Sequence, residues 1–151
     1  MSDLLDVLMF RMGGGETFGV DVMNVREIIV SPVITRIPTS RLEVEGMMSL
    51  RGVIIPVFSL ARMIGCACED DRIKTMIVFE SKGKAYGFLV NHVEKIVSIP
   101  YGSLVQSDAV IGGGESISSI ATIDDQRLVS VLDFERILNK FAAIEPSNEC
   151  G

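Results

Sequence analysis

The chain has 151 residues, 48% of them hydrophobic, and its 14 Lys and Arg against 20 Asp and Glu give a net charge of −6. This length fits one ordinary domain, or two small lobes that share a core. The acidic balance argues against binding to a nucleic-acid backbone, which requires clustered Lys and Arg.

The first residues, Met1–Asp6, are acidic where a secretory signal would be basic. No uncharged apolar run approaches the roughly 18 residues that a membrane-spanning helix needs. We therefore expect a cytoplasmic protein without direct membrane insertion.

Short apolar runs separated by Gly, Asn, Asp and Ser predict an all-β chain with few helices. The predicted strands, in chain order, are Leu5–Met12, Thr17–Val22, Val25–Val30, Val53–Phe58, Ile73–Glu80, Ala85–Val90, Val93–Ile99, Ile117–Ile123 and Arg127–Leu132. The triplets Gly13–Gly15 and Gly112–Gly114 are predicted loop tips, where glycine adopts positive φ at little cost.

Cys66–Arg72 is a polar, acidic segment and is predicted to separate two halves of the chain. It contains Cys66 and Cys68, and Cys150 is the third cysteine. An odd count without regular spacing is not a disulfide framework. Because no Cys or His cluster follows, we predict no metal site.

The two halves resemble one another. Phe18–Ile28 aligns with Tyr86–Ile96, since both read aromatic-Gly-x-x-Val-x-x-Val-x-x-Ile. Val57–Ile64 aligns with Val131–Leu138, and each contains a strand end, a Ser or Asp helix N-cap and a short helix. These matches predict two similar β units, lobe one at about 15–65 and lobe two at about 73–132.

Each lobe alone is marginal for independent stability, so we expect the lobes to share a core. Phe134, Ile137, Leu138 and Phe141 have helical spacing, and predict a closing helix over Asp133–Ala143. The domain is predicted to span residues 1–144, with its ends packed across both lobes, and residues 145–151 to be a tail.

The sequence predicts no catalytic, cofactor-binding or metal-ligating residues. It contains no phosphate-binding loop, dinucleotide fingerprint or hydrolase motif. His92 is expected to face solvent at a strand or corner, and the pairs Asp70-Asp71 and Asp124-Asp125 to be solvated turns. A small enzyme or ligand-binding barrel would instead require a pocket with convergent polar groups near His92.

Arg51 stands beside Gly52 between two apolar runs. An arginine in this setting must be solvated, paired or offered to a partner, because burying it unpaired costs several kcal/mol or more. A surface ion pair with Glu27 would contribute only about 0–1 kcal/mol. Stability is therefore a weak reason for both charges, and the alternative is that they orient a protein partner. Along the strand, Val25, Glu27 and Ile29 are expected to share one face, and Val25 and Ile29 to provide a partly exposed apolar surface.

Four segments occur in an order and spacing typical of one family: Phe18–Val22, Val25–Ile29, Ile34–Pro38 and Gly46 with Leu50–Val57. Together they resemble the CheW family of chemotaxis adaptor domains. The similarity extends from about Leu5 to Phe141 and includes Tyr86–Val90 in the second half.

This resemblance implies two intertwined, five-stranded SH3-like barrels around a common hydrophobic core, with short helices. It also implies a non-enzymatic scaffold without cofactors, which couples the cytoplasmic tip of a chemoreceptor to the regulatory domain of the histidine kinase CheA at membrane arrays. The residues that match binding positions are Val25, Glu27, Gly46, Arg51, Gly52, Ala85 and Tyr86. The alternative is the adaptor half of CheV, in which phosphorylation of a fused receiver regulates a CheW-like domain.

Overall fold

The computed structural model describes residues 3–12, 16–30, 32–39, 41–65, 75–106, 117–123 and 127–144, with side chains described to residue 140. Several sequence predictions fall outside these residues: Gly13–Gly15, Cys66–Arg72, Gly112–Gly114, Asp124, Asp125, the Phe141 side chain and the tail with Cys150.

The all-β fold class is confirmed, with eleven strands and few helices in the described part of the chain. The strands are β1 (Leu4–Arg11), β2 (Thr17–Asp21), β3 (Val25–Val30), β4 (Val44–Leu50), β5 (Val53–Ser59), β6 (Thr75–Ser81), β7 (Lys84–Val90), β8 (His92–Pro100), β9 (Val105–Gln106), β10 (Ile117–Ile123) and β11 (Arg127–Leu132). The helices are α1 (Leu60–Ile64), α3 (Phe134–Ile144) and the 3-10 turns η1 (Val22–Asn24) and η2 (Tyr101–Ser103). Among these strands, the predictions missed β4 and β9.

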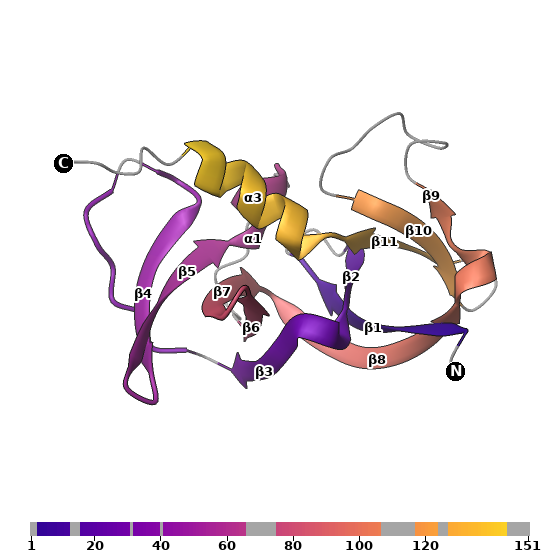
Figure 1. Ribbon diagram of the computed structural model, residues 1–151, viewed down its shortest axis with the longest axis horizontal. Helices are drawn as coiled ribbons and strands as arrows, with labels where there is room; N and C mark the ends of the chain where they lie inside the picture. Colours follow the sequence, from indigo (N-terminus) through magenta and orange to yellow (C-terminus); the bar gives the residue numbers. More distant parts are fainter. Residues whose placement is uncertain are drawn as a thin grey trace.

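Two sheets contain all eleven strands. Sheet 1 has the order β8-β1-β2-β11-β10-β9, and sheet 2 has the order β3-β6-β7-β5-β4. Each has five long strands, and sheet 1 adds the two-residue β9. In Figure 1, sheet 2 lies at the left and sheet 1 at the right, with α3 along the top.

The sheets do not coincide with the expected lobes at 15–65 and 73–132. Sheet 1 joins β1 and β2 from the first half to β8–β11 from the second, and sheet 2 joins β6 and β7 to β3–β5. The chain therefore crosses between sheets after β2 and again after β7. The two halves are intertwined, and neither sheet is one continuous segment.

The sequence repeat occupies equivalent places in the two sheets. Gly19 lies opposite Met9 on antiparallel β1 and Val131 on parallel β11. Gly87 lies in the same way opposite Val78 on antiparallel β6 and Val57 on parallel β5. Because the pairing partners and directions match, the repeat reflects a shared three-strand arrangement.

Both repeat glycines lie where a side chain would meet a buried neighbour. A Cβ on Gly19 would overlap Val7 Cγ1 and lie 3.3 Å from Val129 Cγ1, whereas a Cβ on Gly87 would lie 2.5 Å from Met76 Sδ. Valine is stiff at χ1, but methionine has three rotatable bonds and adapts. We expect Gly19→Ala to lower the free energy of unfolding by about 1–3 kcal/mol and Gly87→Ala by less, measured by urea denaturation. Equal losses would contradict this explanation.

The core has three parts, set by strand alternation. On β1, Val7 and Met9 pack in an apolar cluster whose buried residues all belong to sheet 1, which we call the interior of sheet 1. Leu8 and Phe10 point the other way, into a central core shared by both sheets. On β6, Met76 and Val78 face the interior of sheet 2, and Ile77 and Phe79 face the same central core. The expected shared core is therefore confirmed.

Both helices begin at the predicted caps and close this core. The Ser59 hydroxyl accepts a hydrogen bond from the Arg62 backbone N–H at 3.4 Å, and the Asp133 carboxylate accepts one from Arg136 N–H at 3.0 Å. Such caps satisfy donors that the first helical turn leaves unpaired. Phe134, Ile137 and Leu138 of α3 are buried in the central core, as their spacing predicts.

Candidate functional site

The predicted interface residues gather where sheet 2 closes on itself. Strands β3 and β4 are the two edges of this sheet. Thr35, in the segment between them, exchanges two backbone hydrogen bonds of 2.8 Å with Met47 on β4. The Arg51 guanidinium donates to a Glu27 carboxylate oxygen at 2.8 Å, which links β3 to the end of β4. Two motifs that are 24 residues apart thus meet at one seam.

Arg51 and Gly52 form the two-residue turn of the β4–β5 hairpin, since Leu50 pairs with Val53. Both have positive φ, 50° for Arg51 and 85° for Gly52, which is typical of a type I′ turn. Asn, Asp or Gly usually occupies the first of these positions, and a left-handed residue with a Cβ costs about 1–2 kcal/mol. The Arg51 side chain is 69% exposed and that of Glu27 is 30% exposed. Their ion pair therefore contributes only about 0–1 kcal/mol to the free energy of unfolding. Stability therefore does not explain arginine here.

Gly46, one of the predicted binding residues, is buried. Its φ is 155°, and a Cβ would overlap the Thr35 carbonyl oxygen. The β4–β5 pairing shifts register between Val44 and Gly46. Gly46 therefore allows the Thr35 backbone to approach β4 and shapes the seam from within.

The predicted apolar residues of β3 are partly exposed, and more exposed apolar residues lie beside them. Val25, Glu27 and Ile29 are all half-buried; Val25 packs on the central core and Ile29 on the interior of sheet 2. The exposed positions alternate with them and include Ile28 and Val30, the latter 70% exposed. The partial exposure predicted for Val25 and Ile29 agrees with their burial, but the most exposed apolar side chains of β3 are those of Ile28 and Val30.

Ala85 and Tyr86 lie close to the arginine although they belong to the second half of the repeat. A pocket of about 550 Å³ is lined by Arg51 and Leu50 from the β4–β5 hairpin and by Ala85 and Tyr86 from β7. We call it the fork pocket, because β5 and β7 pair only at Val57–Ser59 with Gly87–Leu89 and separate beyond this point. The structure thus brings the two predicted groups of binding residues together.

Sequence reasoning missed three charged residues of the fork pocket, Arg26, Glu80 and Lys84. Arg26 and Glu80 both line it, and the Arg26 guanidinium donates to the Glu80 carboxylate at 2.5 Å. Their partnership depends on the β3–β6 pairing, in which a bulge between Val25 and Glu27 shifts the register. A bulge of this kind has no dependable sequence signal.

His92 is exposed at the start of β8, as expected. Within the described ranges, no group of three or more His, Cys, Asp or Glu side chains is placed to hold a metal ion. No helix in this part of the chain is long and apolar enough to cross a membrane.

Comparison with known proteins supports the predicted resemblance. The family model for the CheW-like domain matches residues 6–142. The chain is 31% identical to the chemotaxis protein CheW of Thermotoga maritima, over 93% of this chain and 91% of that protein. It is 28% identical to the chemotaxis protein CheV3 of Helicobacter pylori, over 91% of this chain but only 47% of that protein.

A solved structure shows the same fold. The scaffolding protein TtCheW from Thermoanaerobacter tengcongensis superposes with a TM-score of 0.78 at 26% identity, over 86% of this chain and 89% of that chain. The prediction of two SH3-like barrels with a shared core is confirmed by this match and by the two sheets described above. On the strength of the fold, the seam motifs and these matches, the chain belongs to the family of CheW-like domains.

Proposed function

We propose that this chain is a chemotaxis scaffold that holds the cytoplasmic tip of a chemoreceptor and the regulatory domain of the histidine kinase CheA in one assembly. It would act without catalysis, as a cytoplasmic protein recruited to receptor arrays at the inner membrane. The relatives named CheW and the scaffolding protein TtCheW support this function. The observation that carries it is the exposed, conformationally costly Arg51 at the rim of the fork pocket.

The chemistry of the fork pocket suits a protein partner. Arg51 is a planar donor that can form bidentate bonds, and arginine is enriched at interfaces. Ile54, which lines the same pocket, is 67% exposed. An apolar partner surface would bury such side chains while a carboxylate or carbonyl accepts from Arg51. Val25, Gly46 and Gly52 then serve by fixing the shape of the seam, and Glu27, Ala85 and Tyr86 by lining or orienting it.

The mechanism is positional. The scaffold would hold the receptor and the kinase so that a change in receptor conformation alters the contacts made by the kinase. Such coupling requires only that the bound partners differ in affinity between receptor states. The CheV alternative draws support from the match to CheV3, which covers 47% of that protein and thus bears on the CheW-like fold rather than on regulation by a receiver.

Reversing either charge of the seam is expected to weaken partner binding without unfolding the protein. Arg51→Glu and Glu27→Lys should each raise the Kd for the CheA regulatory domain or for a receptor cytoplasmic fragment at least about fivefold. The melting temperature should change little, because the ion pair contributes only about 0–1 kcal/mol and Arg51 is mostly exposed. Titration calorimetry with each purified partner and a thermal melt provide the two measurements.

Two further variants separate an interface role from a structural one. The double variant Arg51→Glu with Glu27→Lys restores an ion pair but leaves the partner facing reversed charges, so binding should remain weak. Lys95→Glu, an exposed charge reversal on β8 in sheet 1, should leave both affinities unchanged. Full recovery of binding in the double variant would assign the pair to structure, and absence of binding to either partner by the unaltered protein would refute the scaffold function.

A further inference from the structure

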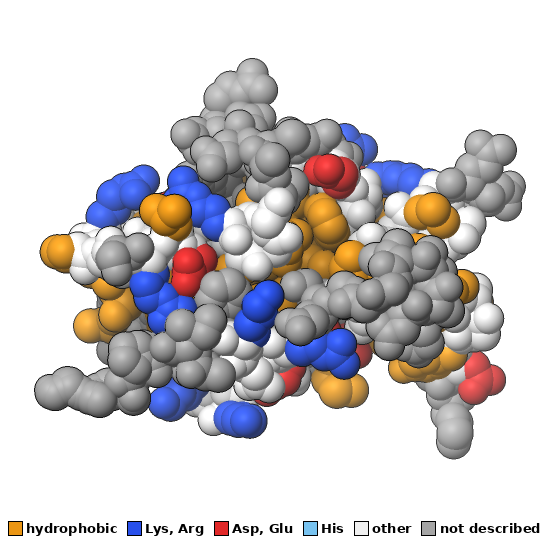
Figure 2. All heavy atoms as spheres, turned by 90° about the horizontal axis from the view of Figure 1, so that it is seen from above, with side chains coloured by type: hydrophobic (Ala, Val, Ile, Leu, Met, Phe, Trp, Pro, Cys, Tyr) orange, Lys and Arg blue, Asp and Glu red, His pale blue; other side chains and the backbone are white. Residues whose placement is uncertain are grey.

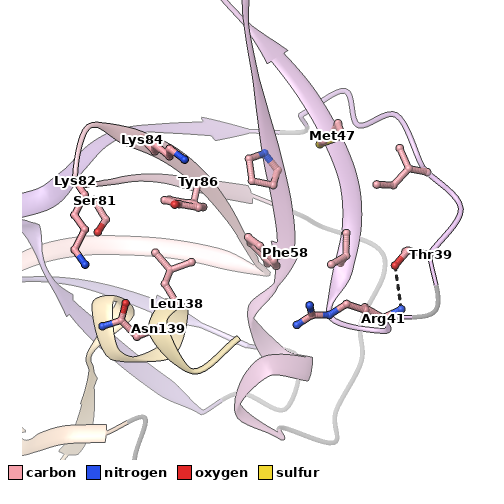
Figure 3. Close-up of a pocket in the computed structure, with 13 residues that line it drawn as sticks. Thr39, Arg41, Met47, Phe58, Ser81, Lys82, Lys84, Tyr86, Leu138 and Asn139 are labelled. Carbon is pink, nitrogen blue, oxygen red and sulfur yellow. Dashed lines mark hydrogen bonds between the residues drawn. The ribbon is translucent and has the colours of Figure 1, made fainter. Parts of the chain in front are cut away.

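A second pocket adjoins the fork pocket and shares Pro56, Lys84 and Tyr86 with it. It measures about 510 Å³ and is enclosed by α3, β4, β5, the β6–β7 hairpin and the segment around Thr39. Figure 3 shows Lys84 and Tyr86 extending from one strand, with Leu138 and Asn139 of the helix on the other side. We call it the lysine pocket, for Lys82 and Lys84 in its wall. Its volume lies within the range of about 300–1,000 Å³ that is usual for small-ligand sites.

Apolar side chains provide one wall of the lysine pocket. Phe58, Met47 and Leu138 line it, and Leu138 is buried. The ring of Tyr86 lies 6.5 Å from that of Phe58, measured between centroids, so two aromatic faces border the same space. This wall would accept the apolar body of a ligand.

The lysine pocket also carries positive charge that the described residues do not neutralise. Arg41 is paired with Glu43 at 2.9 Å, and Ser81 donates to Glu135 at 2.6 Å. By contrast, neither the Lys82 nor the Lys84 ammonium group forms an ion pair or hydrogen bond with another residue in the described part of the chain. Figure 2 shows Lys and Arg side chains gathered over the half of the molecule that contains sheet 2. Two unpaired cations are notable in a chain whose net charge is −6.

Lys82 also occupies a position that favours other residues. Its φ is 54°, and Gly83 after it has φ 80°, which makes Lys82-Gly83 a second type I′ turn, between β6 and β7. Asn or Gly would adopt this conformation at lower cost. A strained residue held at the rim of a pocket is the usual signature of a binding role.

We propose that the lysine pocket binds a small organic anion, with its acidic group attracted by the positive charge of Lys82 and Lys84 and its apolar body against Phe58 and Leu138. The Tyr86 hydroxyl and the Asn139 amide have no hydrogen-bond partner among the described residues, and both line the pocket. They would supply further polar contacts to the acidic group. This inference does not depend on the scaffold function, because it concerns a ligand and a pocket that can be tested without receptor or kinase.

The test uses two probe acids and their neutral amides: phenylacetate with phenylacetamide, and octanoate with octanamide. Titration of the whole chain, followed by NMR amide chemical shifts, should give saturable shifts at Lys82–Tyr86 and at Leu138–Asn139 for at least one acid, with a Kd below about 10 mM. The matching amide should bind at least about fivefold more weakly, because it lacks the charge that the lysines recognise.

The double variant Lys82→Gln with Lys84→Gln keeps most of each side-chain stem and removes both charges. It should weaken binding of the acid about tenfold or more, while Lys95→Gln on β8 should not change it. The inference is overturned if neither acid produces saturable shifts at the pocket, if acid and amide bind equally, or if the double variant binds as well as the unaltered chain.

Discussion

Replacing Phe134 with alanine is expected to lower the free energy of unfolding by about 3–5 kcal/mol. The ring is buried at the start of α3 and touches both sheets. Its centroid lies 4.4 Å from that of Phe88 and 5.3 Å from that of Phe79 in sheet 2, and 6.3 Å from that of Phe10 in sheet 1. Truncation would leave a cavity at the place where the intertwined halves meet.

Urea denaturation followed by circular dichroism measures this effect, and the shape of the transition carries a second prediction. Because Phe134 packs on both sheets, the variant should still unfold in one transition, at a lower midpoint. Leu128→Ala, at a β11 position that is 63% exposed, should change the free energy of unfolding by less than about 0.5 kcal/mol. Separate transitions for the two sheets, or a loss below about 1 kcal/mol for Phe134→Ala, would refute the shared core.

The sequence pattern located most strands because their apolar residues are β-branched or aromatic and regularly spaced. β3, β10 and β11 have the predicted bounds. β4 was not predicted from the sequence, because Glu45, Gly46 and Met47 have no β-branched side chains and show no regular alternation of apolar and polar residues. Its pairing is fixed instead by the Arg51-Gly52 turn and by the backbone hydrogen bonds between Thr35 and Met47. Because Thr35 is distant from β4 in the sequence, a local sequence pattern does not predict this contact.

The repeat predicted equivalent segments but could not predict which sheet each would join. Similar strands can pair within one half or across halves, and the choice depends on the crossings after β2 and β7. For the same reason, the fork pocket was beyond sequence reasoning. Arg51 and Tyr86, two separately predicted binding residues, line the same pocket. Their proximity comes from the parallel pairing of β5 with β7 across the two halves of the chain.

The two sheets share an equivalent strand arrangement but differ in how exposed their charged side chains are. Arg26 aligns with Glu94, and Glu80 on β6 occupies the place of Arg11 on β1, so each sheet has an ion pair at this position with the charges exchanged. In sheet 1, Arg127 adds a second contact to Glu94 at 3.3 Å, and Glu94 is only 14% exposed. In sheet 2, Arg51 remains mostly exposed beside Glu27. The common frame thus presents a more accessible arginine at the sheet 2 seam, while in sheet 1 two arginines share the largely buried Glu94.

Gly46→Ala is expected to be the most damaging small change at the seam, with a loss of about 3 kcal/mol in the free energy of unfolding. The new Cβ would overlap the Thr35 carbonyl oxygen, which accepts the Met47 backbone N–H at 2.8 Å. Relief of the overlap requires the Thr35 segment to move away from β4 and to break this closure. Since Arg51 reaches Glu27 across the same seam, affinity for the CheA regulatory domain should fall as well.

Two other glycines separate the overlap from backbone strain. Gly52 has φ 85° and Gly102 has no positive φ, and a Cβ at either would meet nothing within 4 Å. Gly52→Ala should therefore lose about 1 kcal/mol from conformation alone, and Gly102→Ala should be nearly neutral. Urea denaturation of the three variants gives this order directly. If Gly46→Ala were no less stable than Gly52→Ala, the approach of Thr35 to β4 would not be what requires glycine, and the seam would have to be closed mainly by the Glu27–Arg51 pair.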